Sequence, residues 1–272
     1  MLSIDSWPQL HQPVLIYHLS GWVDAGSAGA SAIEILASQL DSARTFARYD
    51  LADLLDLQQT RPTVQLTDGE TREVVWPELL FTAGKLGRDV VLCLGPEPSV
   101  RWQTFSAELV DVIKRLDVQQ AYGVGGMPAV VSHRRSIGVL ATATSPSLAQ
   151  EVGALRTDYH GPTGLQTVLQ VALGDAGIPT VGLWAQVPHY VAAYPCPPSV
   201  RVLVERIRDL AGLAVSLTEL DERCQTYLTR VEEGISERPD VQELVRAIEA
   251  QGPELPSGDE LASEIERFLR NQ

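Results

Sequence analysis

The sequence has few of the features that mark secreted, metal-binding or membrane proteins. Its 272 residues include three cysteines, Cys93, Cys196 and Cys224, which lie far apart and form no C-x-x-C pattern. We therefore expect neither a disulfide framework nor a metal site. No apolar run approaches the roughly 18 residues that cross a bilayer. The N-terminal stretch MLSIDSWP has no basic region and no signal-peptide core. These absences predict a cytoplasmic protein without membrane contact.

Positive charge is also scarce. The chain has 21 Lys and Arg residues against 35 Asp and Glu residues, and its formal net charge is −14. Such a surface repels phosphate backbones and anionic lipids, which argues against nucleic-acid binding. Apolar residues make up 44% and charged residues 21%, as is typical of globular proteins. The length allows one large domain or a domain with an appendage.

Local enzyme signatures are missing as well. The sequence contains no G-x-x-x-x-G-K-[ST], G-x-G-x-x-G, G-x-S-x-G, S-x-x-K or H-E-x-x-H pattern. Catalytic groups can also assemble from distant segments. The sequence therefore favours a non-catalytic protein and predicts no cofactor, although it does not decide whether the protein is an enzyme.

Strand-like and helix-like segments alternate between residues 13 and 198. Short apolar runs predict buried parallel strands at 14–19, 90–94, 118–124, 137–144 and 180–187. Apolar residues at three- and four-residue spacing predict helices at 27–40, 102–116 and 163–174, and Ser145 and Pro146 predict the start of another. This order is typical of an α/β fold with a mainly parallel sheet between two layers of helices.

Two segments depart from that order. Residues 63–75, TVQLTDGETREVV, contain two alternating runs joined by Asp-Gly and predict an inserted β-hairpin. From about residue 199 the strands stop, and capping-box patterns at 216–219, 240–243 and 257–260 predict helices. We therefore divide the chain into an α/β domain, 1–198, and an acidic all-helical appendage, 199–272. The appendage either packs on the core or presents a surface to a partner.

The first candidate site is the turn GWVDAG at residues 21–26, between a predicted strand and a predicted helix. Such turns lie at the carboxyl edge of an α/β sheet, where ligands bind. In one interpretation Gly21, Trp22, Asp24 and Gly26 belong to a binding edge. In the other, Asp24 caps the helix and Trp22 is a packed lid, since a carboxylate at this point would repel an anion.

Three further segments carry candidate residues. A predicted glycine corner at 123–129 contains Gly125, Gly126 and Pro128, and His133 follows it in what we expect to be a solvent-exposed turn. The segment 158–164 contains Asp158, His160, Gly161 and Gly164, and a strand end contains Pro188, His189 and Tyr190. In a catalytic interpretation, these histidines share a cleft in which Asp24 or Asp158 is the orienting carboxylate. In a structural interpretation, each histidine only makes hydrogen bonds that stabilise its turn.

Taken together, these four motifs resemble the proteasome assembly chaperone 2-like family, in particular its bacterial members. The resemblance covers residues 13–200. It implies a three-layer α/β fold similar to the phosphorylase/hydrolase-like architecture, self-association as a homo-oligomer such as a trimer, and protein partners such as proteasome subunits. Archaeal relatives that dock on the proteasome carry a C-terminal hydrophobic–Tyr–X motif, whereas this sequence ends FLRNQ, which argues against docking by that route.

Two hypotheses follow from the sequence. In the first, the chain is a non-catalytic assembly chaperone or adaptor that binds proteins through apolar corners and its acidic tail. In the second, it is a small-molecule-binding protein or a hydrolase- or phosphorylase-like enzyme, with a pocket at the carboxyl edge of the sheet. The second requires Asp24 and a histidine around one cavity, and the first requires an exposed apolar patch.

Overall fold

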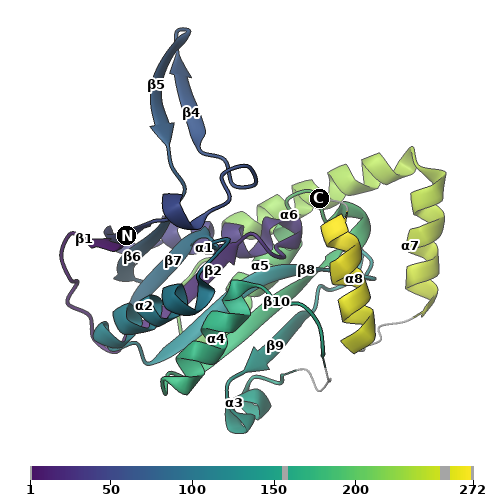
Figure 1. Ribbon diagram of the computed structural model, residues 1–272. Helices are drawn as coiled ribbons and strands as arrows, with labels where there is room; N and C mark the ends of the chain where they lie inside the picture. The colour runs from purple at the N-terminus through teal and green to yellow at the C-terminus, as the bar shows by residue number, and fades with distance from the viewer. Residues whose placement is uncertain (1, 155–158, 252–257, 271–272) are drawn as a thin grey trace.

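The computed structural model describes residues 2–154, 159–251 and 258–270. Within these ranges the architecture is a central sheet with helices on both faces (Figure 1). The eight strands of this sheet have the order β1-β3-β6-β7-β2-β8-β10-β9. Their bounds are β1 Leu2–Ile4, β2 Val14–Ser20, β3 Asp41–Asp50, β6 Glu78–Lys85, β7 Asp89–Pro96, β8 Gln120–Ala129, β9 Val139–Ala143 and β10 Thr180–Pro188. This confirms the predicted α/β fold class.

The middle of the sheet is parallel and its two sides are antiparallel. Strands β7, β2, β8 and β10 run side by side in parallel. Strands β1, β3 and β6 continue the sheet on one side in antiparallel pairs. On the other side β9 pairs antiparallel to β10, so its interpretation as another parallel strand was wrong. The parallel strands all end at one edge, which places the residues that follow them close together.

Helices cover both faces of this sheet. Their bounds are α1 Ala28–Ser38, α2 Trp102–Arg115, α3 Pro146–Glu151, α4 Leu165–Asp175, α5 Pro197–Ala211, α6 Thr218–Ser236, α7 Pro239–Gln251 and α8 Gly258–Arg270, with short 3-10 turns η1 Ala25–Ser27, η2 Ala52–Leu54 and η3 His189–Val191. Helix α3 begins as predicted, because the hydroxyl of Ser145 accepts the N–H of Leu148 at 3.3 Å and Pro146 opens the helix.

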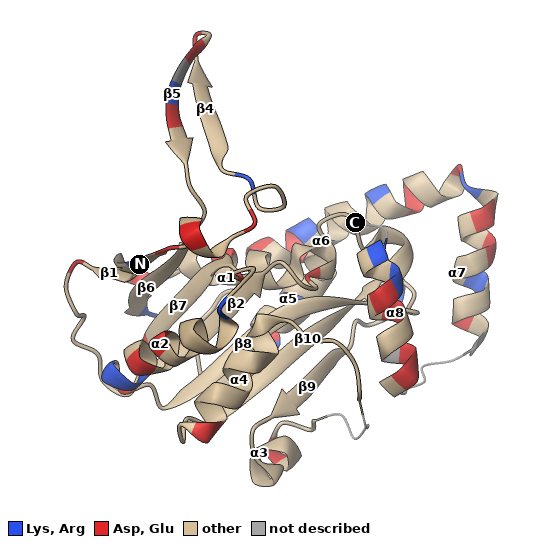
Figure 2. Cartoon of the chain, in the orientation of Figure 1, with Lys and Arg blue, Asp and Glu red and all other residues tan. Residues whose placement is uncertain are grey.

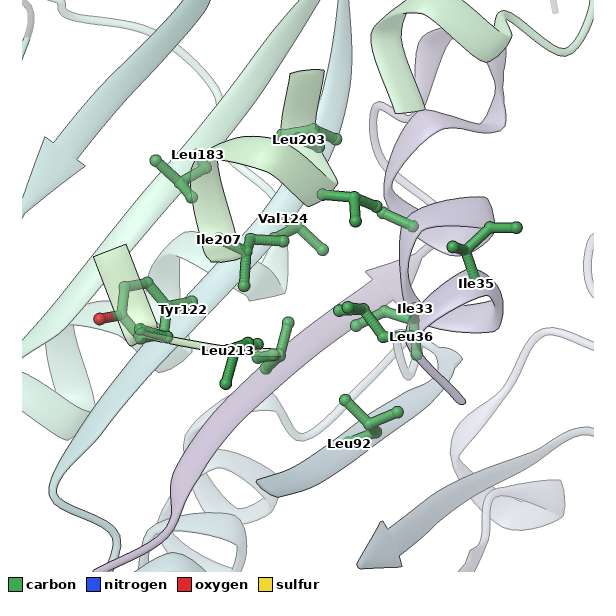
Figure 3. Close-up of a cluster of buried hydrophobic side chains, with 14 of the residues drawn as sticks. Ile33, Ile35, Leu36, Leu92, Tyr122, Val124, Leu183, Leu203, Ile207 and Leu213 are labelled. Carbon is green, nitrogen blue, oxygen red and sulfur yellow. The ribbon is translucent and has the colours of Figure 1, made fainter. Parts of the chain in front are cut away.

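The core is divided into two layers by the alternation of β2. Val14 and Ile16 face α1 and α5, whereas Leu15, Tyr17 and Leu19 face α2 and α4. Figure 3 shows the first layer, where side chains of α1 and α5 meet those of the strands. Every side chain of β2 before Ser20 is buried, as its continuous apolar run predicted.

The predicted hairpin forms a separate sheet. Strands β4, Thr63–Thr67, and β5, Glu70–Val75, pair antiparallel with each other and extend away from the body (Figure 1). The later helices return to the body. Helix α6 contacts α5 and α7 follows α6, while α8 lies against β8. Charged residues are frequent on α6, α7 and α8 and absent from β8, β9 and β10 (Figure 2). The boundary at residue 198 stays a prediction.

Candidate functional site at the carboxyl edge of the sheet

Asp24 is the centre of the first candidate segment. It follows β2, with Gly21 and Gly26 on either side of it in the turn. Its Oδ1 accepts the backbone N–H groups of Gly29 at 2.7 Å and Gly126 at 2.9 Å, and its Oδ2 accepts that of Ala30 at 3.1 Å. Asp24 therefore caps α1 and also joins this helix to β8. A carboxylate satisfies free N–H groups at a helix N-terminus and is favoured by the helix dipole.

A buried histidine lies beneath Asp24. The Nδ1 of His18 is 2.8 Å from the carbonyl oxygen of Val124, so this nitrogen donates, because a carbonyl oxygen only accepts. Its Nε2 lies 3.3 Å from Asp24 Oδ2, in a geometry that gives no hydrogen bond. The His18 side chain is 1% exposed. The sequence analysis missed His18, although a histidine inside the apolar run of β2 was the available signal.

The predicted glycine corner at 123–129 was wrong, because these residues continue β8 to Ala129. These glycines do not form a turn. They lie inside a strand and allow neighbouring groups to approach its backbone closely. A Cβ on Gly126 would lie 2.1 Å from the carbonyl oxygen of Ala25, and one on Gly125 would lie 2.5 Å from the ring of Trp184. Gly126 therefore lets the 3-10 turn before α1 pack onto β8, and Gly125 makes room for an indole.

A polar cavity of about 440 Å³ brings several candidates together. It is lined by Asp24, Ser27, Pro128, His189, Ala192, Ala193, Glu264, Arg267 and Phe268. The last three residues come from α8, so this helix borders the cavity at the carboxyl edge of the sheet. His189 Nδ1 lies 3.3 Å from the carbonyl oxygen of Ala129, and burial lowers the pKa of this histidine. The neutral imidazole is therefore favoured at this site.

A larger cavity of about 650 Å³ contains other candidates. Trp22 and Gly161 line it together with Trp184 and residues of β9 and α4. Gly164 supports Trp22, since a Cβ on Gly164 would lie 2.6 Å from the Trp22 Cβ. His160 is exposed and lines neither cavity, and Asp158 lies outside the described residues.

Glu97 is a second residue that the sequence analysis missed. It follows β7, at the same edge as Gly21, and its Oε2 accepts the N–H of Leu165 at 2.8 Å, which caps α4. Burial raises the pKa of this carboxyl, and the Leu165 hydrogen bond opposes that shift. Its position after a parallel strand was the signal that would have found it.

His133 does not lie in a solvent-exposed turn, and that prediction was wrong. Its side chain is 1% exposed, its Nδ1 is 2.7 Å from the Tyr190 hydroxyl, and its Nε2 is 3.1 Å from Glu232. Arg134 binds the same carboxylate through two nitrogens at 2.6 and 2.8 Å, and this pairing lowers the Glu232 pKa to about 2. Tyr190 thus belongs with His133, Arg134 and Glu232 to a structural anchor. Pro188 is the last residue of β10. The anchor attaches α6 to the β8–β9 loop.

The arrangement of these groups limits the chemistry. Within the ranges that the structure describes, no cluster of three or more His, Cys, Asp or Glu side chains is placed to hold a metal ion. Over the same residues, no helix is both long and apolar enough to cross a bilayer. Asp24 and His189 line one cavity and can offer hydrogen bonds to a polar ligand, but three backbone N–H groups already occupy the Asp24 oxygens.

The comparison with known proteins agrees with the four motifs. Among solved structures, a proteasome-assembly chaperone homologue from Mycobacterium tuberculosis is 36% identical over 85% of this chain and 99% of its own, with a TM-score of 0.78. A PAC2 family protein from Streptomyces avermitilis is 34% identical over 86% of this chain and 99% of its own, with the same TM-score. An archaeal proteasome activator from Pyrococcus furiosus, 17% identical with a TM-score of 0.68, covers 86% of this chain and 97% of its own and shares the fold.

No functionally curated protein matches the chain in sequence. The model of the PAC2 family matches residues 18–235, a range that starts at the buried histidine of β2 and ends near the end of α6. This range includes every segment that carries a candidate residue. The chain therefore belongs to the PAC2 family.

Proposed function

We propose that this chain is a non-catalytic assembly chaperone or adaptor that acts by binding other proteins, with proteasome subunits as the partner class. Homologues described as a proteasome-assembly chaperone homologue and as a proteasome activator support that class. The proposal includes self-association as a homo-oligomer such as a trimer. The observation that carries it is the apolar surface of the β4–β5 hairpin.

The hairpin presents an apolar face to solvent. Val64 and Leu66 alternate along β4 and so lie on one face, and Val74 of β5 pairs opposite Val64. These three side chains are 54%, 62% and 45% exposed. Val75 and Trp76, at the base of the hairpin, are also half exposed. Residues 64–76 therefore contain half of the exposed large apolar residues in the described part of the chain.

An isolated ribbon of this kind needs a partner. The hairpin's strands pair only with each other in the described sheets, and a two-stranded sheet alone is marginally stable in water. Its free edges and apolar face favour pairing with another protein. Such a projecting surface suits a protein that holds an unassembled subunit.

The second candidate function is a small-molecule-binding protein or enzyme at the carboxyl edge. The observation that favours it is that Asp24 and His189 line the same cavity of about 440 Å³. The observation against it is that Asp24 is already engaged by Gly29, Ala30 and Gly126. A general base needs a free oxygen within reach of a substrate proton.

The test is a tagged pull-down from native lysate with mass spectrometry, comparing two matched charge substitutions on the hairpin. Leu66→Asp places a carboxylate on the apolar face, and Gln65→Asp places one on the opposite face of the same strand. We expect wild type and Gln65→Asp to retain proteasome subunits and to be oligomeric when measured by light scattering, and we expect Leu66→Asp to lose its partner.

Two outcomes would contradict this proposal. Equal partner binding by both variants would exclude the apolar face of the hairpin as the docking surface. A wild-type protein that elutes without any stoichiometric partner would overturn the adaptor function and leave the second candidate. Both variants should unfold at the wild-type temperature, because the changed side chains are solvent-exposed.

A further inference from the structure

The cavity of about 650 Å³ lies on the β9–β10 side of the sheet. Helices α4 and α8 lie on either side of it, with β10 and β9 between them (Figure 1). Met127 of β8 and Leu140 of β9 contribute to its floor, and Val171 of α4 and Ile265 of α8 to its walls. This volume lies within the range of about 300–1,000 Å³ that is usual for small-molecule sites.

One indole, that of Trp184, lies close to the backbone of two strands. The six-membered ring of Trp184 covers Gly125 on the neighbouring strand, since a Cβ there would lie 2.5 Å from Cζ3 and 2.8 Å from Cε3. Its Nε1 points toward Gly182, where a Cβ would lie 3.4 Å away. The two glycines, on adjacent strands, thus leave room for the ring, and Trp184 lines the cavity.

A second indole lines the cavity from a distant segment. Trp22, in the turn after β2, packs its Cβ and ring onto Gly164 at the start of α4, where a Cβ would lie 2.6–2.9 Å from it. Trp22, Trp184 and Tyr159 belong to one apolar cluster with Met127 and Leu140. Gly125 and Gly164, which belong to two of the motifs, therefore make room for Trp184 and Trp22 in one cavity. A role of these glycines in a turn or in phosphate binding would not explain this arrangement.

All but one of the described polar side chains that line the cavity are neutral. Thr142 of β9 and Gln170 of α4 are joined by hydrogen bonds of 3.1–3.2 Å, and both lie over the bare backbone of Gly182. Among the described lining residues none is Lys or Arg, and Asp175 is the one with a charge. An anionic ligand would therefore find no charge partner, and the net charge of −14 would repel it.

From this geometry we infer that the cavity is a binding site for a neutral planar ring compound of small-molecule size. Its ring lies against the indoles of Trp184 and Trp22, and a hydrogen-bonding substituent reaches the Thr142–Gln170 pair. This site differs in position from the cavity around Asp24 and His189, and it works independently of the hairpin.

The test uses two probes with the same ring and different charge, 2-naphthol and 2-naphthalenesulfonate, in calorimetric titrations at neutral pH. We expect saturable binding of 2-naphthol at one site per chain. We expect the sulfonate to bind at least tenfold more weakly. Trp184→Ala should weaken 2-naphthol binding at least tenfold, which corresponds to about 1.4 kcal/mol, because the ligand loses both an aromatic contact and buried apolar area. Trp76→Ala, on the distant hairpin, should leave it unchanged.

A second variant, which adds a positive charge to the cavity, keeps the test informative if Trp184→Ala does not fold. Val171 lines the cavity and is 56% exposed, so Val171→Lys should fold normally. It should strengthen sulfonate binding at least tenfold, whereas Val130→Lys, at an exposed valine outside the cavity, should not. Absence of saturable 2-naphthol binding, sulfonate binding as tight as naphthol in the wild type, or equal effects of the two lysines would each overturn the inference.

Discussion

The carboxylate of Asp24 accepts the backbone N–H of Gly126 at 2.9 Å, although 102 residues separate them in the chain. This one hydrogen bond connects the turn after β2 to the interior of β8. The same oxygen also accepts the N–H of Gly29. Asp24 thus holds together two strands and a helix, and its role is larger than that of a simple helix cap.

Removal of this carboxylate should therefore destabilise the fold. Asp24→Ala leaves three backbone N–H groups without their acceptor and should lower the free energy of unfolding by about 3 kcal/mol, since each buried unsatisfied donor costs about 1–3 kcal/mol. Asp24→Asn keeps one acceptor oxygen and should cost about 1–2 kcal/mol. Urea unfolding at neutral pH measures both. Asp111→Ala, at an exposed position in α2, is the control. A loss below about 1 kcal/mol for Asp24→Ala would mean that the three bonds contribute only as an ordinary cap.

Two glycine-to-alanine substitutions should have opposite effects. Gly126→Ala forces a Cβ to within 2.1 Å of the Ala25 carbonyl oxygen, and the backbone shift should cost about 3 kcal/mol or prevent folding. Gly234→Ala, in α6 with open space around it, should stabilise the protein by about 0.5–1 kcal/mol. Thermal unfolding of the two variants distinguishes them. Similar midpoints would show that β8 and the η1 turn separate easily, which contradicts the close packing described above.

The anchor of α6 should lose its contribution in acid. The hydrogen bond from Arg134 lowers the Glu232 pKa from 4.5 to about 2. Because the folded pKa lies below the unfolded one, this carboxylate stabilises the fold above about pH 4.5 and loses that effect as the pH falls toward 2. The stability difference between wild type and Glu232→Gln should be constant from pH 6 to 7 and shrink below about pH 4.5. Glu233→Gln, at the exposed next residue, should show no such trend. A pH-independent difference for Glu232→Gln would exclude the ion pair as the anchor.

The local patterns predicted those elements whose burial is uniform or whose caps are encoded nearby. Continuous apolar runs identified β2 and β7 because both faces of these strands are buried. Ser145 and Pro146 identified α3 because a cap and a first-turn proline act within four residues. Strand β3 gave no comparable signal, since its first half, from Asp41, is polar and largely exposed.

The candidate site was less accessible to such reasoning because its contacts join distant segments. Nothing near Gly125 indicates that Trp184 covers it, and nothing near Gly126 indicates the approach of Ala25. His133 has polar and basic neighbours in sequence, yet Tyr190 and Glu232 bury it from two other elements. Glycine and histidine patterns therefore marked positions of close packing without revealing their partners.

Helix α8 gives the two cavities a common wall, with Ile265 on the larger one and Phe268 on the smaller one. A shared element of this kind is where two binding sites can be linked thermodynamically. A ligand that displaces α8 on filling one cavity alters the affinity of the other, and occupancy of the second alters the first by the same factor. The carboxyl edge and the tryptophan-lined face, which differ in polarity, can in this way respond to each other without any contact between their ligands.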